Sequence, residues 1–375
     1  MKFRSERDSL ADVLVAAGRA VGGRASSSAV LSGLMLRTEG NLLEVTGTDL
    51  DLTIRVDHEV IGIEDGVCVV PSRLTADVVR ALEAGAVTVD TDDDKVEISS
   101  ARAHFGLRSY PPVEFPMLPR PATPTVTLPR GVLVEALRQV VRAASNDDAR
   151  PLLTGVLMTT EAKTVRLVAT DSYRLSLRDL RGTATLPQGG DVLVPARALA
   201  ELLRLAPAGG APGDGEGAGA EVGIAPGTSD ITFETGRVRI STRLLEGTYP
   251  DYRQLIPEHY PNRLHVGRES LLAALRRVRL LVRDNTTPVR LAMRPNGVDL
   301  SVVSQEIGDA SETVDGDFSG EQLVIAFNPG YLIDGVDAVL DDEVFIETDD
   351  PGKPATVRAA GRDDFRYLLM PVRVS

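Results

Sequence analysis

Apolar residues recur at a four-residue spacing in three separate stretches of the chain. Residues three or four positions apart lie on one face of a helix. The pattern therefore predicts three amphipathic helices, each with one buried face. The buried positions are Leu10, Leu14 and Ala17, then Leu133, Leu137 and Val141, and finally Leu271, Leu275 and Val278.

Each predicted helix is followed by strand-like segments that resemble one another in sequence. The first set is residues 31–36, 153–158 and 289–293, and the second is 45–50, 167–172 and 301–305. Their short, alternating apolar runs are joined by turn residues, which is typical of antiparallel sheet. A second helix is predicted after them, with Pro71, Pro195 and Pro329 in its first turn, where proline is well tolerated.

The markers occur three times in the same order, which predicts three copies of one domain. The fold class is α+β, with two helices and antiparallel sheets in each copy. The predicted domains cover residues 1–120, 125–250 and 256–375. A segment at 206–227, rich in Gly, Ala, Pro and acidic residues, is expected to be a flexible surface insertion in the second copy.

Composition favours a cytoplasmic globular protein. The 375 residues are 43% hydrophobic and 25% charged, and no apolar run approaches the roughly 20 residues of a membrane helix. The first six residues lack the apolar region of a signal peptide. The single cysteine, Cys68, excludes an internal disulfide and lies among valines, which indicates a buried structural thiol.

No catalytic, metal or cofactor site is expected. The histidines His58, His104, His259 and His265 are scattered without metal-ligand spacing. The glycine-rich run at 213–217 is acidic and does not follow a predicted strand, so it does not fit a phosphate loop. A cytosolic enzyme built on three repeats is the alternative, and it would need convergent catalytic groups that the sequence does not offer.

Arginines gather on the predicted helices although the net charge is −13. Negative net charge argues against nucleic-acid binding, but it does not describe how charge is distributed. A charged helix face is usually only solvated. If the three copies form a ring with these helices inside, however, an acidic protein acquires a basic channel.

Aromatic residues, proline, methionine and arginine occur together in three loop or terminal segments, at 170–175, 249–253 and 367–374. This composition suits a protein-binding pocket, and packing between domains explains it equally well.

The motifs that these segments contain resemble those of the bacterial sliding clamps, the beta subunit of DNA polymerase III. The resemblance covers essentially the whole chain and rests on residues 47–50, 169–171 with 174–175, 194–197, 245–253, 327–328 with 331, and 370–373. It implies a three-domain clamp fold and a homodimer that closes head-to-tail around duplex DNA. Phe105 and Leu107 would then meet Leu280 and Leu281 of the other protomer.

The function implied by the resemblance is processivity, without chemistry of the chain's own and without sequence preference on DNA. Catalysis would belong to other polymerase subunits, and an ATP-dependent loader would open the ring. Polymerase and clamp-loader subunits would bind through short peptide motifs in a cleft between the second and third domains, and peptide-like inhibitors could use the same cleft. A second-copy or inhibitor-tolerant clamp, or a clamp-like scaffold that is not loaded on DNA, remains an alternative.

Residues carry over to this chain position by position. The implied cleft residues are Leu153, Thr170, Ser172, Tyr173, Arg174, Leu175, Pro250, Gln254, Leu255, Asn328, Tyr331, Leu368, Met370, Pro371, Val372 and Arg373. The arginines expected to face DNA are Arg24, Arg138, Arg142, Arg150, Arg276, Arg277 and Arg279. The chain departs from the family at Gln254, often arginine, at Ser172, often glycine, at Pro151–Leu152, a tyrosine pair in some members, and at Ala29, usually proline.

Overall fold

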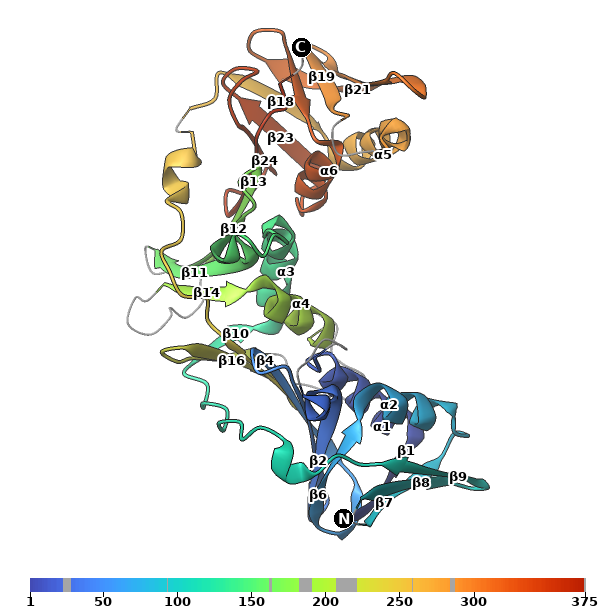
Figure 1. Cartoon of the computed structure of the whole chain (residues 1–375). Coiled ribbons are helices and arrows are strands. Elements are labelled where there is room, and N and C mark those ends of the chain that lie inside the picture. The colour runs from blue at the N-terminus through green and yellow to red at the C-terminus, as the bar shows by residue number, and fades with distance from the viewer. Residues whose placement is uncertain are drawn as a thin grey trace. The chain divides into compact units, whose positions relative to one another are not determined.

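The computed structural model describes residues 1–22, 28–92, 94–161, 164–181, 191–206, 221–257, 259–283 and 287–373 (Figure 1). These residues form two compact units, Met1–Val134 with Arg197–Leu244, and Glu135–Ala196 with Leu245–Ser375. Every paired strand within them is antiparallel, as the alternating pattern predicts.

The first unit contains a five-stranded sheet in the order β5-β1-β7-β8-β9. Its strands are β5 (Ile61–Glu64), β1 (Lys2–Glu6), β7 (Ala86–Asp92), β8 (Lys95–Ser100) and β9 (Ala103–Arg108). Among the described strands, β9 pairs with β8 alone, so one side of β9 is an open sheet edge.

An eight-stranded sheet completes the first unit, in the order β10-β15-β16-β17-β4-β3-β2-β6. Its strands are β10 (Val126–Pro129), β15 (Glu221–Pro226), β16 (Asp230–Thr235), β17 (Val238–Arg243), β4 (Leu52–Glu59), β3 (Leu42–Thr48), β2 (Gly33–Glu39) and β6 (Gly66–Pro71). The pairing of β17 with β4 places Ile240 opposite Ile54 and joins the first copy to the second by backbone hydrogen bonds.

Helices α1 (Arg7–Gly18), α2 (Ser72–Ala81) and α4 (Ala196–Leu205, from Arg197 onward) belong to the first unit. The predicted face of α1 is buried, since Leu10, Leu14 and Ala17 are at most 1% exposed. A Cβ on Gly47 of β3 would come within 2.1 Å of the Ala17 carbonyl oxygen, so this close helix–strand approach requires glycine.

The second unit is built on one twelve-stranded sheet, in the order β14-β11-β12-β13-β25-β24-β23-β18-β21-β20-β19-β22. From the second copy come β14 (Val192–Pro195), β11 (Gly155–Glu161), β12 (Thr164–Thr170) and β13 (Arg174–Leu180). From the third come β25 (Phe365–Leu369), β24 (Ala355–Ala359), β23 (Glu343–Thr348), β18 (Asn262–Gly267), β21 (Gly308–Ser319), β20 (Gly297–Ser304), β19 (Val289–Arg294) and β22 (Leu323–Phe327). Strands β13 and β25 join the two copies, with Leu175 opposite Leu368.

Helices α3 (Arg130–Val140, from Glu135 onward), α5 (Arg268–Val278) and α6 (Pro329–Asp337) lie in this unit. Helices α5 and α6 pack against each other beside the third-copy strands (Figure 1). The short 3-10 turns of the chain are η1 (Ala29–Ser32), η2 (Pro112–Glu114), η3 (Val141–Ala143), η4 (Pro151–Thr154), η6 (Tyr252–Leu255) and η7 (Arg279–Leu281).

The repeated helices are confirmed, with small shifts of their ends. Val141 follows α3 in a 3-10 turn, not in the helix itself. Pro329 begins α6 as predicted, whereas Pro71 and Pro195 are the last residues of β6 and β14, so their placement inside the helix was wrong. Both prolines keep extended pairing partners, Gly33 and Gly155, and the helix begins one residue later.

The segment predicted as a flexible insertion is in part a strand. Residues 221–226 form β15, in which Val222 and Ile224 are fully buried, so the prediction of an irregular loop was wrong there. Residues 207–220 lie outside the described residues. Val222 and Ile224 alternate as strand residues do, but the surrounding Gly- and Pro-rich composition favoured a loop.

Candidate functional site

A tight turn between β12 and β13, within the second unit, forms the centre of the site. The Thr170 hydroxyl donates to the carbonyl oxygen of Arg174 at 2.6 Å. Asp171 Oδ1 accepts hydrogen bonds from the backbone N–H groups of Tyr173 and Arg174, at 2.9 and 3.0 Å. Short polar side chains of this kind stabilise turns by replacing backbone partners.

Ser172 occupies the turn position that demands an unusual backbone. Its φ of 80° lies in the left-handed region, which side chains other than glycine rarely adopt. This is the physical reason why glycine fits the position. The serine hydroxyl lies 3.3 Å from an Arg150 guanidinium nitrogen, which can donate to it.

The Arg174 side chain is held from several directions although it lies near the surface. Its guanidinium donates to Asp171 Oδ2 at 3.0 Å and to Asp334 Oδ2 of α6 at 2.5 Å. Its carbon Cζ lies 4.3 Å from the centre of the Tyr331 ring, in a cation–π arrangement. With only 10% of its side chain exposed, Arg174 fixes the turn of the second copy to α6 of the third.

Two tyrosines extend this contact. Tyr367 is fully buried, which raises the pKa of its phenol, and its hydroxyl donates to the Tyr331 carbonyl oxygen at 2.9 Å. Asn328 begins α6 as its N-cap, accepting from the Tyr331 N–H at 3.1 Å. The ring of Tyr173 stacks on that of Tyr331 with centres 6.5 Å apart.

The last described residues run alongside this turn. The Met370 N–H donates to the Tyr173 carbonyl oxygen at 2.9 Å, and the Val372 N–H donates to that of Ala326 at 2.7 Å. Leu368 packs beneath them in an apolar cluster with Leu157, Val168, Leu175, Leu177, Leu193 and Tyr252. Residues 368–372 therefore form a structured wall of the site.

A small hollow of about 80 Å³ opens over this cluster, and we call it the cleft. Its lining residues are Thr170, Ser172, Arg174, Leu175, Leu255, Pro354, Leu368, Leu369 and Met370. Leu255 and Met370 are 46% and 43% exposed, and Tyr173 beside the hollow is 59% exposed. Exposed apolar side chains around a concave, arginine-bearing site suit an apolar peptide.

Seven of the residues expected in the cleft line it, and Tyr173, Asn328 and Tyr331 contact those residues or one another. The others do not line this hollow: Leu153, Pro250, Gln254, Pro371, Val372 and Arg373. Gln254 donates to Asp251 Oδ2 at 2.8 Å instead. No sequence pattern marks Pro354 or Asp334 as a residue of the site, because their partners lie far away along the chain.

The arginines expected to face DNA differ in their surroundings. Arg142 pairs with Asp337 at 3.0 Å, Arg276 pairs with the same carboxylate at 3.4 Å, and Arg277 forks onto Glu312. Arg138 and Arg279 are exposed, and no carboxylate pairs with either in the part of the chain that is described. The acidic residues of α6 thus neutralise part of the predicted basic face.

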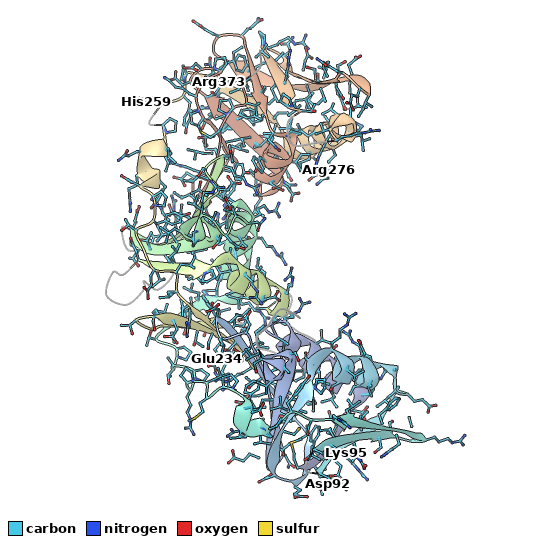
Figure 2. The ribbon with its side chains drawn as sticks, in the orientation of Figure 1. Asp92, Lys95, Glu234, His259, Arg276 and Arg373 are labelled. Atoms are coloured by element: carbon cyan, nitrogen blue, oxygen red, sulfur yellow. The ribbon has the colours of Figure 1, made fainter. Side chains whose placement is uncertain are left out.

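Two further arginines complete that set. Arg150 donates to Asp147 Oδ2 at 2.9 Å and lies beside Ser172, so it belongs as much to the cleft turn as to a DNA surface. Arg24 lies outside the described residues. Figure 2 shows Arg276 on its helix, in the second unit.

The residues expected at the dimer interface are available for contact in their own units. Phe105 is 39% exposed and Leu107 is half-buried, both on the open-edged strand β9. Leu280 is 82% exposed, while Leu281 packs partly against the third-copy core.

Groups of three or more metal-ligating side chains do not occur among the described residues. In the same part of the chain, no helix has the length and apolar character needed to cross a membrane. Cys68 is buried, which raises the pKa of its thiol to about 12 and agrees with the structural role predicted for it.

Comparison with known proteins finds matches along nearly the whole chain. Models of the N-terminal, central and C-terminal domains of the DNA polymerase III beta subunit match residues 1–119, 127–251 and 253–373. A beta sliding clamp of Streptomyces coelicolor is 35% identical, with both chains covered completely. Two solved clamps also cover and are covered by the chain completely: one from Bartonella birtlesii bound to griselimycin, 28% identical with a TM-score of 0.92, and one from Bacillus subtilis, 27% identical with a TM-score of 0.90.

Proposed function

The chain belongs to the DNA polymerase III beta subunit family, the beta sliding clamps. We propose the following account of how it acts as a sliding clamp. Two copies close head-to-tail into a ring around duplex DNA. The cleft binds short peptide motifs of the polymerase and of the clamp loader. Its role is processivity, and the nucleotide chemistry belongs to other subunits.

The observation that carries this proposal is the matching of all three domain models, in order, across the chain. The cleft supports its peptide-binding part, since Arg174 is fixed by Asp171 and Asp334 beside exposed apolar walls. A fixed guanidinium can donate to peptide carbonyl or carboxylate groups without first losing side-chain entropy.

The proposed ring has its three domains at 1–120, 125–250 and 256–375 in each protomer. The contact would join the open-edged strand β9 of one protomer to the exposed Leu280 and its neighbour Leu281 of the other. It would bury the apolar side chains of Phe105 and Leu107. A head-to-tail contact that closes produces a ring instead of a filament. Topology then holds DNA, so no base contact is needed and sequence preference is absent.

The decisive experiment compares retention on circular and linear DNA after loading by a bacterial clamp loader. A working clamp stays on nicked circular plasmid and slides off the linearised plasmid. Light scattering across a dilution series accompanies it, with an expected mass near twice 40.1 kDa. Equal loss from both DNAs by a stable dimer would indicate a scaffold that is not loaded, and would contradict the proposal.

The helix arginines are tested by charge reversal. Arg138→Glu combined with Arg279→Glu should weaken retention on circular DNA, because these exposed guanidiniums lack carboxylate partners among the described residues and are therefore available to phosphates. The control is Arg37→Glu with Arg290→Glu, the same charge change at exposed positions of β2 and β19. Equal retention by the two double variants would remove these helices from the DNA surface.

A further inference from the structure

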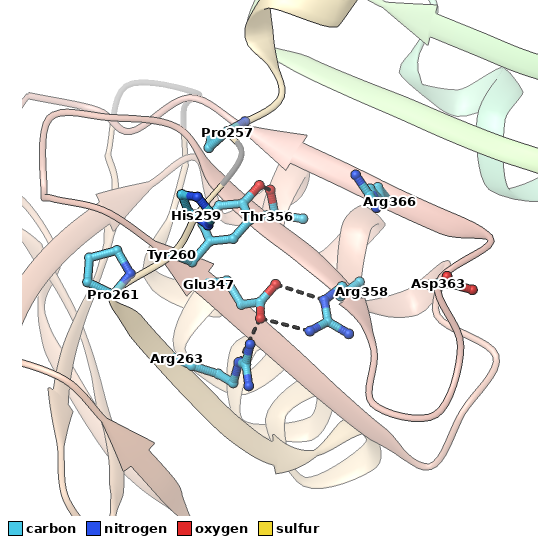
Figure 3. A pocket seen from close by; sticks show the side chains of 10 residues that line it. All are labelled: Pro257, His259, Tyr260, Pro261, Arg263, Glu347, Thr356, Arg358, Asp363 and Arg366. Atoms are coloured by element: carbon cyan, nitrogen blue, oxygen red, sulfur yellow. Dashed lines mark hydrogen bonds and ion pairs between the residues drawn. The ribbon is translucent and has the colours of Figure 1, made fainter.

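A second hollow, of about 610 Å³, lies on the face of the third-copy sheet formed by β18, β23, β24 and β25 (Figure 3). We call it the arginine pocket. The residues that matter in it are Tyr260, Arg263, Glu347, Thr356, Arg358 and Arg366. Three of its lining residues are arginines, although the net charge of the chain is −13.

One carboxylate organises two of the guanidiniums. Glu347 is only 2% exposed; its Oε1 accepts from Arg263 Nε at 2.7 Å and from Arg358 Nη2 at 2.8 Å, while its Oε2 accepts from Arg358 Nε at 2.7 Å. Burial alone would raise the pKa of Glu347, but Arg358 and Arg263 lower it overall, so the carboxylate stays ionised. Both arginines are thereby held in fixed positions.

The third arginine is uncompensated. Arg366 is half-buried on β25, and the described residues provide no carboxylate within ion-pair distance of it. The other acid of the lining, Asp363, is already engaged by Arg181 at 2.8 Å. The pocket therefore holds more positive than negative charge, with its surplus at Arg366.

The arginine pocket continues the cleft along the same sheet face. Thr356 of β24 pairs with Leu368 of β25, so the two side chains share a face. Arg358 and Arg366 lie two residues further along these strands and therefore share it too. The connecting segment also passes from one hollow to the other, since Leu255 lines the cleft and Pro257 lines the pocket.

The helices lie against the opposite face of the sheet. Tyr367, which alternates with Arg366 and Leu368, packs its ring against Gly335 of α6, where a Cβ would come within 2.5 Å of it. The arginine pocket thus opens away from the helices that are proposed to face DNA. A peptide leaving the cleft is the ligand that this position favours.

We propose that the arginine pocket binds acidic residues that flank a cleft-bound peptide, with Arg366 making the principal ion pair. This assignment rests on the proposed peptide-binding function of the cleft, which it extends from an apolar recognition site to one that also reads charge. Partners with acidic flanks then bind more tightly than partners with neutral ones. The preference weakens as salt increases, because the contact is between partly exposed charges.

The test uses fluorescein-labelled synthetic peptides with a Leu-Phe apolar core and either three glutamates or three glutamines, placed on either side of the core. Anisotropy titrations with the full-length chain give the affinity of each peptide. When the three residues lie on the side of the core that faces the arginine pocket, the glutamate peptide should bind about fivefold more tightly than the matching glutamine peptide. Arg366→Gln should remove this difference, while Arg290→Gln, the same charge change at an exposed position outside the pocket, should preserve it.

The outcomes separate the two proposals. Equal binding of glutamate and glutamine peptides at measurable affinity would overturn the arginine pocket and leave the cleft standing. If no peptide binds at all, the cleft proposal fails and the pocket fails with it. Reduced retention on circular DNA by Arg366→Gln, with the peptide preference unchanged, would assign the pocket to nucleic acid and overturn the present assignment.

Discussion

The turn after β3 in the first copy and the turn after β12 in the second have the same backbone and different side-chain roles. In each, a threonine hydroxyl donates to the carbonyl oxygen four residues later, Thr48 to Leu52 at 3.1 Å and Thr170 to Arg174 at 2.6 Å. Asp49 accepts from the Leu52 N–H at 2.8 Å, as Asp171 accepts from the N–H of Arg174.

The left-handed residue is repeated as well, with φ of 81° at Leu50 and 80° at Ser172. The difference lies in the residue that ends the turn. Leu52 is 2% exposed in the core of its unit, whereas Arg174 contacts Asp334 and Tyr331 of another copy. The repeat therefore supplies a rigid turn, and the single side chain that ends it decides whether the turn packs in a core or contributes to a binding site.

Exchanging the two end residues tests this reading, and Leu52→Arg should have the largest effect. The guanidinium would replace a buried leucine without a partner, which costs more than about 4 kcal/mol of unfolding free energy. Urea denaturation of the full chain should show early loss of structure in the first unit. A stability within 1 kcal/mol of wild type would mean that Leu52 does not serve as a core residue.

The reverse exchange, Arg174→Leu, should cost less stability and should strongly weaken peptide binding in the cleft. Asp171 and Asp334 would lose the guanidinium that they share. The free energy of unfolding should fall by about 2–3 kcal/mol, a moderate loss because Asp334 is partly exposed. Affinity for the Leu-Phe peptides should fall at least tenfold, while the dimer mass stays unchanged. Met370→Ala at the opposite wall is the matched control, since it should weaken binding without this loss of stability.

Relieving the backbone should have the smallest effect, and it is stabilising. Leu50→Gly and Ser172→Gly each remove a side chain from a left-handed position, which should raise stability by about 0.5–1 kcal/mol after the entropy cost of glycine. Leu50 is 48% exposed, so removing its side chain also loses some burial, and the gain at Leu50 should be smaller than the gain at Ser172. Thermal denaturation measures the gain, and a lower melting temperature for both variants would show that the turns carry no strain.

The sequence predicted the repeated elements because periodicity is a local property. The buried face of α1 and the alternating strands follow from spacing alone. The same reasoning missed β15, whose Val222 and Ile224 are too few to stand out beside a Gly-rich stretch. It also placed Pro71 and Pro195 one step too far into their helices.

The cleft was predictable only in part, because its members come from distant segments. The Thr-Asp pair and the terminal Met370 were visible as motifs. No sequence pattern around Asp334 indicates that it belongs to the cleft, and only the fold brings it to Arg174. The arginine pocket was equally hidden, since Arg263, Arg358 and Arg366 are single charges on three different strands whose order along the chain does not reveal their pairing.

The continuation of sheets between copies has a consequence for dissecting the molecule. Because β17 hydrogen-bonds to β4 in the first unit and β13 to β25 in the second, the copies are not separable modules. A fragment that ends near residue 120 would keep β4 paired with β3 but would expose the other edge of β4 over Leu52–Val56, a template for intermolecular pairing and aggregation. The chain should therefore unfold and refold with strong coupling between neighbouring copies, and its isolated pieces should be far less soluble than the whole.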